Sequence, residues 1–193
     1  MIVNLPNILS LTRILLVPLL VAVLLTKFEG KEFVGLAVFL VASLTDFLDG
    51  YIARRRKLVT KLGKLLDPAA DKILNSAALI ALVELELAPA WMVAAIIARE
   101  FAVSALRSVA ASDNLVLGAI PSAKIKTITQ MVAIALLIIY ERLGSFERLA
   151  PVSLWIAMLV SLYSGFEYFF RYGPRLFGSG RSRAESPSAD TGT

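Results

Sequence analysis

Four aspartates in the first half of the chain have the spacing of a metal site. Asp46 and Asp49 are three residues apart, and Asp67 and Asp71 are four residues apart, so each pair lies on one face of a helix. Both pairs fall in apolar segments, where an ionised carboxylate is costly and indicates a functional site. Oxygen ligands of this kind favour Mg²⁺, Mn²⁺ or Ca²⁺ over zinc or copper.

The sequence offers carboxylates for this chemistry and lacks two other common metal ligands. It contains neither cysteine nor histidine, so no thiolate or imidazole can serve as ligand or base. Four neighbouring carboxylates remain ionised in a low-dielectric site only if cations neutralise them. Two divalent cations about 3.5 to 4 Å apart can hold the attacking and leaving oxygens of a displacement at phosphorus.

The elements that position these residues are predicted to be transmembrane helices. The chain has 193 residues, of which 58% are hydrophobic, which is more apolar surface than a soluble core of this size can bury. Six segments are long and apolar enough to cross a bilayer, at about 8–26, 33–53, 65–83, 88–110, 121–140 and 151–170. We therefore expect an all-α integral membrane bundle of six helices over residues 1–177, followed by a disordered tail over 178–193.

The distribution of positive charge orients the bundle. Lys and Arg concentrate after the second segment, around the fourth-to-fifth connection and at the C-terminal end, whereas the opposite side is richer in Glu. Because Lys and Arg are retained on the cytoplasmic side, we expect both termini and the active site to be cytoplasmic, in a bacterial-type cytoplasmic membrane. A basic collar beside anionic membrane lipid explains the pI of about 9.6 without nucleic acid.

The two carboxylate pairs are predicted to meet at one depth. At 1.5 Å per residue, Asp46 and Asp49 lie roughly 20 and 24 Å from the outer end of the second helix. Asp67 and Asp71 lie roughly 6 and 12 Å from the cytoplasmic start of the third helix, near Gly63. The sequence thus predicts one cytoplasm-facing cavity that contains all four carboxylates.

Small residues beside the aspartates leave room for a diphosphate. Gly50 and Ala53 lie one and two turns from Asp46, and Gly63 opens the third helix. A structural role is also open for one acid, because Asp67 followed by Pro68 fits a helix N-cap with proline at the first helical position.

These residues resemble the signature of the CDP-alcohol phosphotransferases, Asp-x2-Asp-Gly-x2-Ala-Arg-x8-Gly-x3-Asp-x3-Asp. The chain keeps every spacing, with Asp46, Asp49, Gly50, Ala53, Arg54, Gly63, Asp67 and Asp71 at the fixed positions. The resemblance implies six transmembrane helices, a homodimer, and a cavity where CDP-diacylglycerol and an alcohol meet over two divalent cations, Mg²⁺ or Mn²⁺.

The resemblance also assigns roles to residues. It implies metal binding by Asp46, Asp49, Asp67 and Asp71, with Asp71 also taking the proton of the acceptor hydroxyl. It implies binding of CDP-diacylglycerol by Asn7, Asp49, Gly50, Ala53, Arg54, Gly63 and Asp67. The guanidinium of Arg54 suits bidentate contact with a phosphate.

Other stretches resemble the branch of the family that uses sn-glycerol 3-phosphate as acceptor. They are Asn4-Leu5-Pro6-Asn7 with Thr12-Arg13, then Ile97-Ala98-Arg99-Glu100, Ser104-Ala105-Leu106-Arg107 and Lys124-Ile125-Lys126-Thr127. The glycine expected before Lys124 is Ala123, which departs from the branch pattern.

A basic cluster independently favours a phosphorylated acceptor. Arg99 lies inside the fourth segment and requires an anionic partner, and Glu100 is expected to point about 100° away from it. Arg107 follows two turns later on nearly the same face, and Lys124 and Lys126 begin the fifth segment at that level. A phosphomonoester such as that of sn-glycerol 3-phosphate would satisfy these four cations.

Three other interpretations are open on the sequence. Arg99 can instead pair with a carboxylate inside the membrane such as Glu167, leaving the other three cations to orient the chain. The acceptor can be serine, an inositol compound or phosphatidylglycerol. A divalent-cation transporter is a more remote interpretation, since the second half shows no counterpart of the acidic cluster.

Overall fold

The computed structural model describes the backbone of residues 5–56, 61–112 and 120–184, and the side chains of 8–45, 63, 66–112 and 120–174. Within this part of the chain the fold is all-helical, as predicted. The helices are α1 (Leu5–Leu25), α2 (Lys31–Arg56), α3 (Lys61–Glu84), α4 (Ala90–Ser112), α5 (Pro121–Ile138) and α6 (Leu149–Ala184), with short 3-10 turns η1 (Tyr140–Arg142) and η2 (Gly144–Phe146) before α6.

Local sequence signals account for several helix ends. Gly30, with φ at +78°, makes the turn between α1 and α2, and Pro121 begins α5 after an extended Ile120. The helical span of α6 continues to Ala184, beyond residue 178 where we placed the start of the tail. Residues 185–193 lie outside the described part of the chain.

The alternative in which Asp67 caps a helix N-terminus is wrong. α3 begins at Lys61, so Asp67 lies in the second turn and Pro68 is inside the helix. The helix therefore accepts a proline about two turns further in than the usual first position and loses one backbone hydrogen-bond donor there. Asp67 therefore does not cap α3, and its carboxylate contacts Ser10 of α1.

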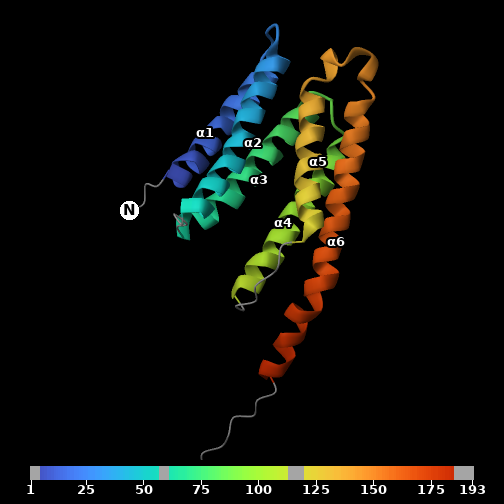
Figure 1. Cartoon of the computed structure of the whole chain (residues 1–193). Helices are drawn as coiled ribbons and strands as arrows, with labels where there is room; N and C mark the ends of the chain where they lie inside the picture. Colours follow the sequence, from blue (N-terminus) through green and yellow to red (C-terminus); the bar gives the residue numbers. More distant parts are fainter. Residues whose placement is uncertain (1–4, 57–60, 113–119, 185–193) are drawn as a thin grey trace, which may run out of the picture.

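The six helices form two groups of three (Figure 1). α1 packs extensively against both α2 and α3, and α6 packs extensively against both α4 and α5. Contacts between the two groups are fewer and involve α2 with α5, α3 with α4, and α3 with α5. We call these groups the α1–α3 half and the α4–α6 half.

A shared apolar core joins the two halves. Phe39 and Leu74 come from the α1–α3 half and Ile96, Ile134 and Leu154 from the other, and all are almost completely buried. The helices also expose many large apolar side chains on the outside of the bundle, including Leu15, Phe101, Ile128, Phe166 and Phe170. Such a surface needs an apolar solvent, which fits a membrane protein.

Among the residues that the structure describes, three helical spans are long and apolar enough to cross a membrane: Ile8–Leu25, Pro121–Ile138 and Gly144–Pro174. α3 contains Asp67, Asp71 and Lys72, and α4 contains Arg99, Glu100 and Arg107. These charged residues lower the hydropathy of both helices. The residues that could do chemistry are therefore also the ones that weaken the membrane signal of the helices carrying them.

At one end of the bundle an ion pair joins the buried carboxylate of α2 to a half-exposed arginine of η1. Glu32, at the start of α2, lies 3.4 Å from Nη2 of Arg142 in η1. A backbone hydrogen bond, together with the Arg142 guanidinium, holds the pKa of the Glu32 carboxyl below its usual value despite its burial. The carboxyl is therefore charged at neutral pH, and this end of the bundle is held together far from the aspartates.

Candidate active site

The backbone brings the two aspartate pairs to the same end of the bundle. Asp46 and Asp49 lie in the second half of α2, and Asp67 and Asp71 lie in the first half of α3. α2 ends at Arg56 and α3 begins only five residues later, so these two helix ends are close in space. The side chains of Asn7, Asp46, Asp49, Gly50, Ala53 and Arg54 lie outside the described side chains, and their assigned roles stay predictions.

Neutral donors hold the two described carboxylates of the signature. The hydroxyl of Ser10, a completely buried residue on α1, donates a hydrogen bond to Oδ1 of Asp67. Nδ2 of Asn75, one turn along α3, donates to Oδ1 of Asp71 at 2.9 Å. Both carboxylates are half-buried, and Gly63 is buried at the start of the same helix. Hydrogen bonds from neutral groups fix the direction of a carboxylate without cancelling its charge.

α1 also contributes a buried cation beside α2. Arg13 is almost completely buried, and its Nε donates to the backbone oxygen of Ala42 at 3.1 Å. Sequence reasoning noted Arg13 in a motif but missed Ser10. A serine in an apolar helix gives a weak sequence signal, because its hydroxyl can bond its own backbone as easily as another helix.

Carboxylates in this setting fit hard divalent cations. Among the described residues no three potential ligands come together, and Asp67 and Asp71 are the signature acids whose side chains are described. Their oxygens are the ligand type that Mg²⁺ and Mn²⁺ prefer. The donor chemistry on α3 therefore agrees with the predicted metal site, and α2 supplies the other two aspartates at the same end.

The α4–α6 half contains a buried charge network. Oε1 of Glu100 lies 3.0 Å from Nη1 of Arg99 and 2.5 Å from Nζ of Lys126. Nη2 of Arg99 donates to the hydroxyl of Ser164 on α6 at 2.8 Å. The side chains of all three charged residues are at most 13% exposed. Two cations and one carboxylate thus share a site inside the bundle.

The expectation that Glu100 points away from Arg99 is wrong. Adjacent helical residues leave the helix axis about 100° apart, but both side chains are long and can bend toward one polar region among apolar surroundings. The alternative that Arg99 pairs with a carboxylate inside the bundle is confirmed, but its partner is Glu100 and not Glu167, whose Oε2 lies 2.6 Å from the hydroxyl of Ser122. Arg99 is neutralised by its own neighbour in sequence.

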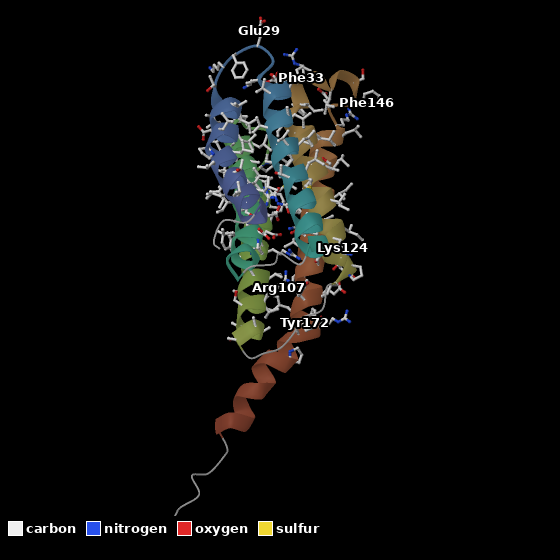
Figure 2. The ribbon with its side chains drawn as sticks, turned by 60° about the vertical axis from the view of Figure 1, so that its left-hand side comes forward. Glu29, Phe33, Arg107, Lys124, Phe146 and Tyr172 are labelled. Carbon is white, nitrogen blue, oxygen red and sulfur yellow. The ribbon has the colours of Figure 1, made fainter. Side chains whose placement is uncertain are left out.

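The other two predicted cations lie away from this network. Arg107 on α4 and Lys124 on α5 are exposed. Figure 2 shows both at the end of the bundle opposite Glu29 and Phe33. The structure brings together Arg99 and Lys126 but leaves Arg107 and Lys124 at the periphery.

Lys72 is a further cation that sequence reasoning missed. It follows Asp71 directly, is half-buried, and interacts electrostatically with Asp71, Glu100, Arg107 and Lys126. The cost argument that singled out Arg99 applies equally to a lysine within an apolar helix and could have found it. The charge of Lys72 is attracted by Asp71 and Glu100 and repelled by Arg107 and Lys126, so Lys72 lies within electrostatic range of charged groups in both halves.

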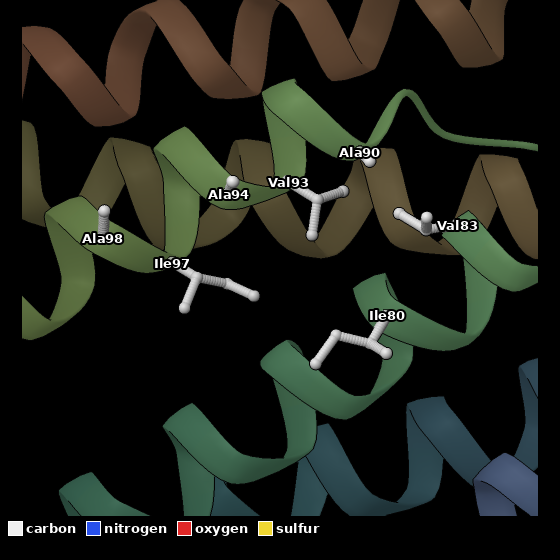
Figure 3. A pocket seen from close by; sticks show the side chains of 7 residues that line it. All are labelled: Ile80, Val83, Ala90, Val93, Ala94, Ile97 and Ala98. Atoms are coloured by element: carbon white, nitrogen blue, oxygen red, sulfur yellow. The ribbon is translucent and has the colours of Figure 1, made fainter.

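A cavity of about 770 Å³ between α3 and α4 opens beside Lys72. Lys72, Ser104 and Arg107 supply polar atoms to its wall, whereas Ile80 and Phe101 are apolar. Ile80 also lines an adjoining groove of about 420 Å³, where Figure 3 shows only Ile, Val and Ala side chains from α3 and α4. This surface changes from charged to wholly apolar, as expected where a ligand has a charged head and apolar chains.

Comparison with known proteins identifies the family. A model of the CDP-alcohol phosphatidyltransferase family matches residues 3–163, which is most of the chain. The chain belongs to this family. It is a family of membrane transferases of phospholipid biosynthesis.

Several relatives share more than the family. The chain is 45% identical over 181 residues to a CDP-diacylglycerol–glycerol-3-phosphate 3-phosphatidyltransferase of Bacillus subtilis, with 86% of this chain and 93% of the relative covered. It is 36% identical over 170 residues to the protein of that name from Rickettsia felis, with the same coverage. It is 39% identical over 180 residues to a protein named as the second such enzyme of Arabidopsis thaliana, covering 84% of this chain and 77% of the relative.

Proposed function

We propose that this protein transfers the phosphatidyl group of CDP-diacylglycerol to sn-glycerol 3-phosphate and releases phosphatidylglycerophosphate and CMP. The observation that supports a phosphorylated acceptor is the buried pair of cations, Arg99 and Lys126, which share the single carboxylate of Glu100 inside the α4–α6 half. The names of the relatives, which span nearly the whole chain, support the same reaction.

The reaction is a displacement at phosphorus. The oxygen of the 1-hydroxyl of glycerol 3-phosphate attacks the β-phosphorus of CDP-diacylglycerol. The bond from that phosphorus to the oxygen bridging the two phosphates breaks, and CMP leaves with this oxygen. Asp71 takes the hydroxyl proton as general base. The hydrogen bond from Asn75 to Oδ1 of Asp71 keeps the carboxylate in one orientation.

Asp46, Asp49, Asp67 and Asp71 would hold two divalent cations, Mg²⁺ or Mn²⁺. Bound there, the cations would supply charge neutralisation for the diphosphate. Asn7, Gly50, Ala53, Arg54 and Gly63 would line the nucleotide and diphosphate site beside them. Ser10 supports this arrangement because it fixes the carboxylate of Asp67 from α1.

The net positive charge of Arg99, Lys126 and Glu100 favours a phosphorylated acceptor. Glu100 neutralises one of the two cations Arg99 and Lys126, so the trio keeps one positive charge, and Lys72 lies within electrostatic range of it. A phosphomonoester can take charge-assisted hydrogen bonds from such a site, whereas a neutral alcohol gains nothing from it. Arg107 and Lys124 would assist from the exposed periphery by attracting the anion.

Mass spectrometry of reaction products tests this proposal. The purified full-length protein would be incubated with CDP-diacylglycerol and, in separate reactions, glycerol 3-phosphate, glycerol, serine, inositol 1-phosphate or phosphatidylglycerol. We expect phosphatidylglycerophosphate and CMP from glycerol 3-phosphate and little product from glycerol. Equal use of glycerol and glycerol 3-phosphate would remove the case for a phosphate site and leave the reaction class intact.

We further propose that all six helices span the membrane, with both termini and the carboxylates cytoplasmic. Because the chain contains no cysteine, single cysteines can be labelled in an otherwise unreactive protein. In intact cells, a membrane-impermeant maleimide should label a cysteine at position 84 and reach one at position 61 only after permeabilisation. Labelling of position 61 from outside would reverse the orientation. The homodimer stays a prediction.

A further inference from the structure

The carboxylate of Glu100 brings the cations of Arg99 and Lys126 close together. Its Oε1 contacts Nη1 of Arg99 at 3.0 Å and Nζ of Lys126 at 2.5 Å, so the two nitrogens lie within about 5.5 Å of each other. Two like charges this close in a buried site repel strongly unless an anion lies between them. The carboxylate therefore determines where the second cation can be.

The two cations differ in how firmly other groups hold them. The Arg99 side chain passes over Gly165, where an added Cβ would lie 2.8 Å from its Cγ, and its Nη2 is held by Ser164 at 2.8 Å. Lys126 has its described ion pair with Glu100, on a side chain with four rotatable bonds. Loss of Glu100 should therefore leave Arg99 nearly in place and release Lys126.

The cluster retains a donor for a ligand. Nε of Arg99 is buried and has no hydrogen-bond partner in the described part of the chain. A buried donor without a partner is costly, and an incoming phosphate oxygen would satisfy it. This donor lies on the same guanidinium that contacts Glu100 and Ser164, so the network has unused capacity for an anion.

We infer that Glu100 is a positioning residue that holds Arg99 and Lys126 side by side as a two-pronged binding site for the acceptor phosphate. The inference rests on the proposed function of those two cations. A carboxylate repels a phosphate, but this one keeps both donors at a spacing that one phosphate can bridge. Glu100 thus weakens the net charge of the site and improves its geometry.

Steady-state kinetics of the full-length protein with E100Q tests this role. The amide keeps the shape of Glu100 but cannot neutralise two cations. We expect KM for glycerol 3-phosphate to rise about 10-fold, with kcat and the KM for CDP-diacylglycerol within about threefold of wild type. If Glu100 were merely a counter-ion, E100Q would make the site more positive, and KM for glycerol 3-phosphate would fall or stay unchanged. Either result would overturn the inference.

A second variant covers the case in which E100Q does not fold. E100D keeps the charge on a side chain one carbon shorter, so it can no longer reach both cations, and KM for glycerol 3-phosphate should again rise. An unchanged KM in E100D would contradict a role in spacing. The matched control is E32Q, which removes a buried carboxylate paired with Arg142 at the other end of the bundle and should leave both KM values unchanged.

R99A and K126A separate this inference from the proposed function. If both raise KM for glycerol 3-phosphate while E100Q and E100D do not, the acceptor site stands and the role of Glu100 is wrong. If neither R99A nor K126A changes that KM, the acceptor site itself is wrong and the inference falls with it. In the expected case, K126A combined with E100Q should cost less than the product of the single effects, because both remove the same contact.

Discussion

The two halves of the molecule place different hydrogen-bond donors around their carboxylates. In the α1–α3 half, Asp67 and Asp71 accept hydrogen bonds from the neutral groups of Ser10 and Asn75. In the α4–α6 half, Arg99 and Lys126 share the charged carboxylate of Glu100. Neutral donors leave the charge of a carboxylate available to a cation, whereas an internal ion pair lowers the net charge offered to a ligand.

This difference matches the ligands proposed for each half. A site for divalent cations benefits from negative charge that its own hydrogen-bond partners do not cancel, because bound cations would offset the desolvation of the carboxylates. A site for an acceptor that enters and a product that leaves benefits from weaker net charge and fixed geometry. The comparison predicts that substitutions in the first half reduce kcat and that those in the second raise the KM for the acceptor.

The largest effect is expected from the aspartates. Replacing Asp46, Asp49, Asp67 or Asp71 singly by Asn should lower kcat at least about 10²-fold, because each change removes a metal ligand and the change at Asp71 also removes the base. EDTA should abolish wild-type activity, and Mg²⁺ or Mn²⁺ should restore it. Turnover within threefold of wild type for any two of these variants would show that there is no shared metal site.

The next effect is expected from the buried cations. Arg99→Ala and Lys126→Ala should each raise KM for glycerol 3-phosphate roughly 10- to 150-fold, the loss of one charge-assisted contact, while the KM for CDP-diacylglycerol stays near wild type. Lys124→Ala is the matched control, because that lysine is exposed and screened by solvent, and it should cost less than about threefold. Equal effects of Lys124→Ala and Lys126→Ala would mean that burial does not mark the binding residues.

The helices themselves could be predicted from the sequence because hydropathy and turn residues act locally. Predicted segments and observed helices differ by a few residues in most cases, as for 121–140 against Pro121–Ile138. The alternative of Asp67 as an N-cap was wrong, since the Asp-Pro pair permits a helix start without requiring one. α3 packs extensively against α1, which includes the hydrogen bond from Ser10 to Asp67, and this packing of the whole helix overrides that local signal.

Contacts between side chains of the site were less predictable. The position of Arg99 on its helix could be predicted, but its partner could not, since Glu100, Ser164 and Lys126 come together only when three helices pack. Side-chain direction at the helix surface does not determine where a long charged group ends. Ser10 was missed for the same reason, as its role depends on Asp67 of another helix, whereas Lys72 could have been found from the cost of a lysine within an apolar helix.

Substitutions at two glycines test, with a smaller expected effect, whether the position of Arg99 controls acceptor binding. A Cβ at Gly165 would lie 2.8 Å from Cγ of Arg99, and one at Gly35 would lie 2.6 Å from Cδ2 of Leu24. Both Gly→Ala variants should lower stability by about 1 to 3 kcal/mol through overpacking. Only Gly165→Ala should also raise KM for glycerol 3-phosphate, by about 10-fold, because it displaces the guanidinium.

Thermal unfolding and kinetics of the two purified variants would be measured side by side. If Gly35→Ala raised the KM for glycerol 3-phosphate as much as Gly165→Ala, the effect would come from general loosening of the bundle. The position of Arg99 would then not control acceptor binding. A rise in KM for glycerol 3-phosphate that is confined to Gly165→Ala would show that the packing of α6 against Arg99 affects acceptor binding.

The smallest effect is expected at Ser10, which tests the first half through a neutral hydrogen bond. Ser10→Ala removes the donor to Oδ1 of Asp67, and loss of one such bond should lower kcat about fivefold. The half-maximal concentration of Mn²⁺, measured by electron paramagnetic resonance of the free ion, should rise, because the carboxylate can turn away from the metal site. Ser10→Thr keeps the hydroxyl and should recover most of both losses. An Ala variant with lower kcat but unchanged Mn²⁺ binding would mean that Ser10 supports packing of α1 against α3 and does not orient Asp67, so that neutral donors would no longer distinguish this half from the other.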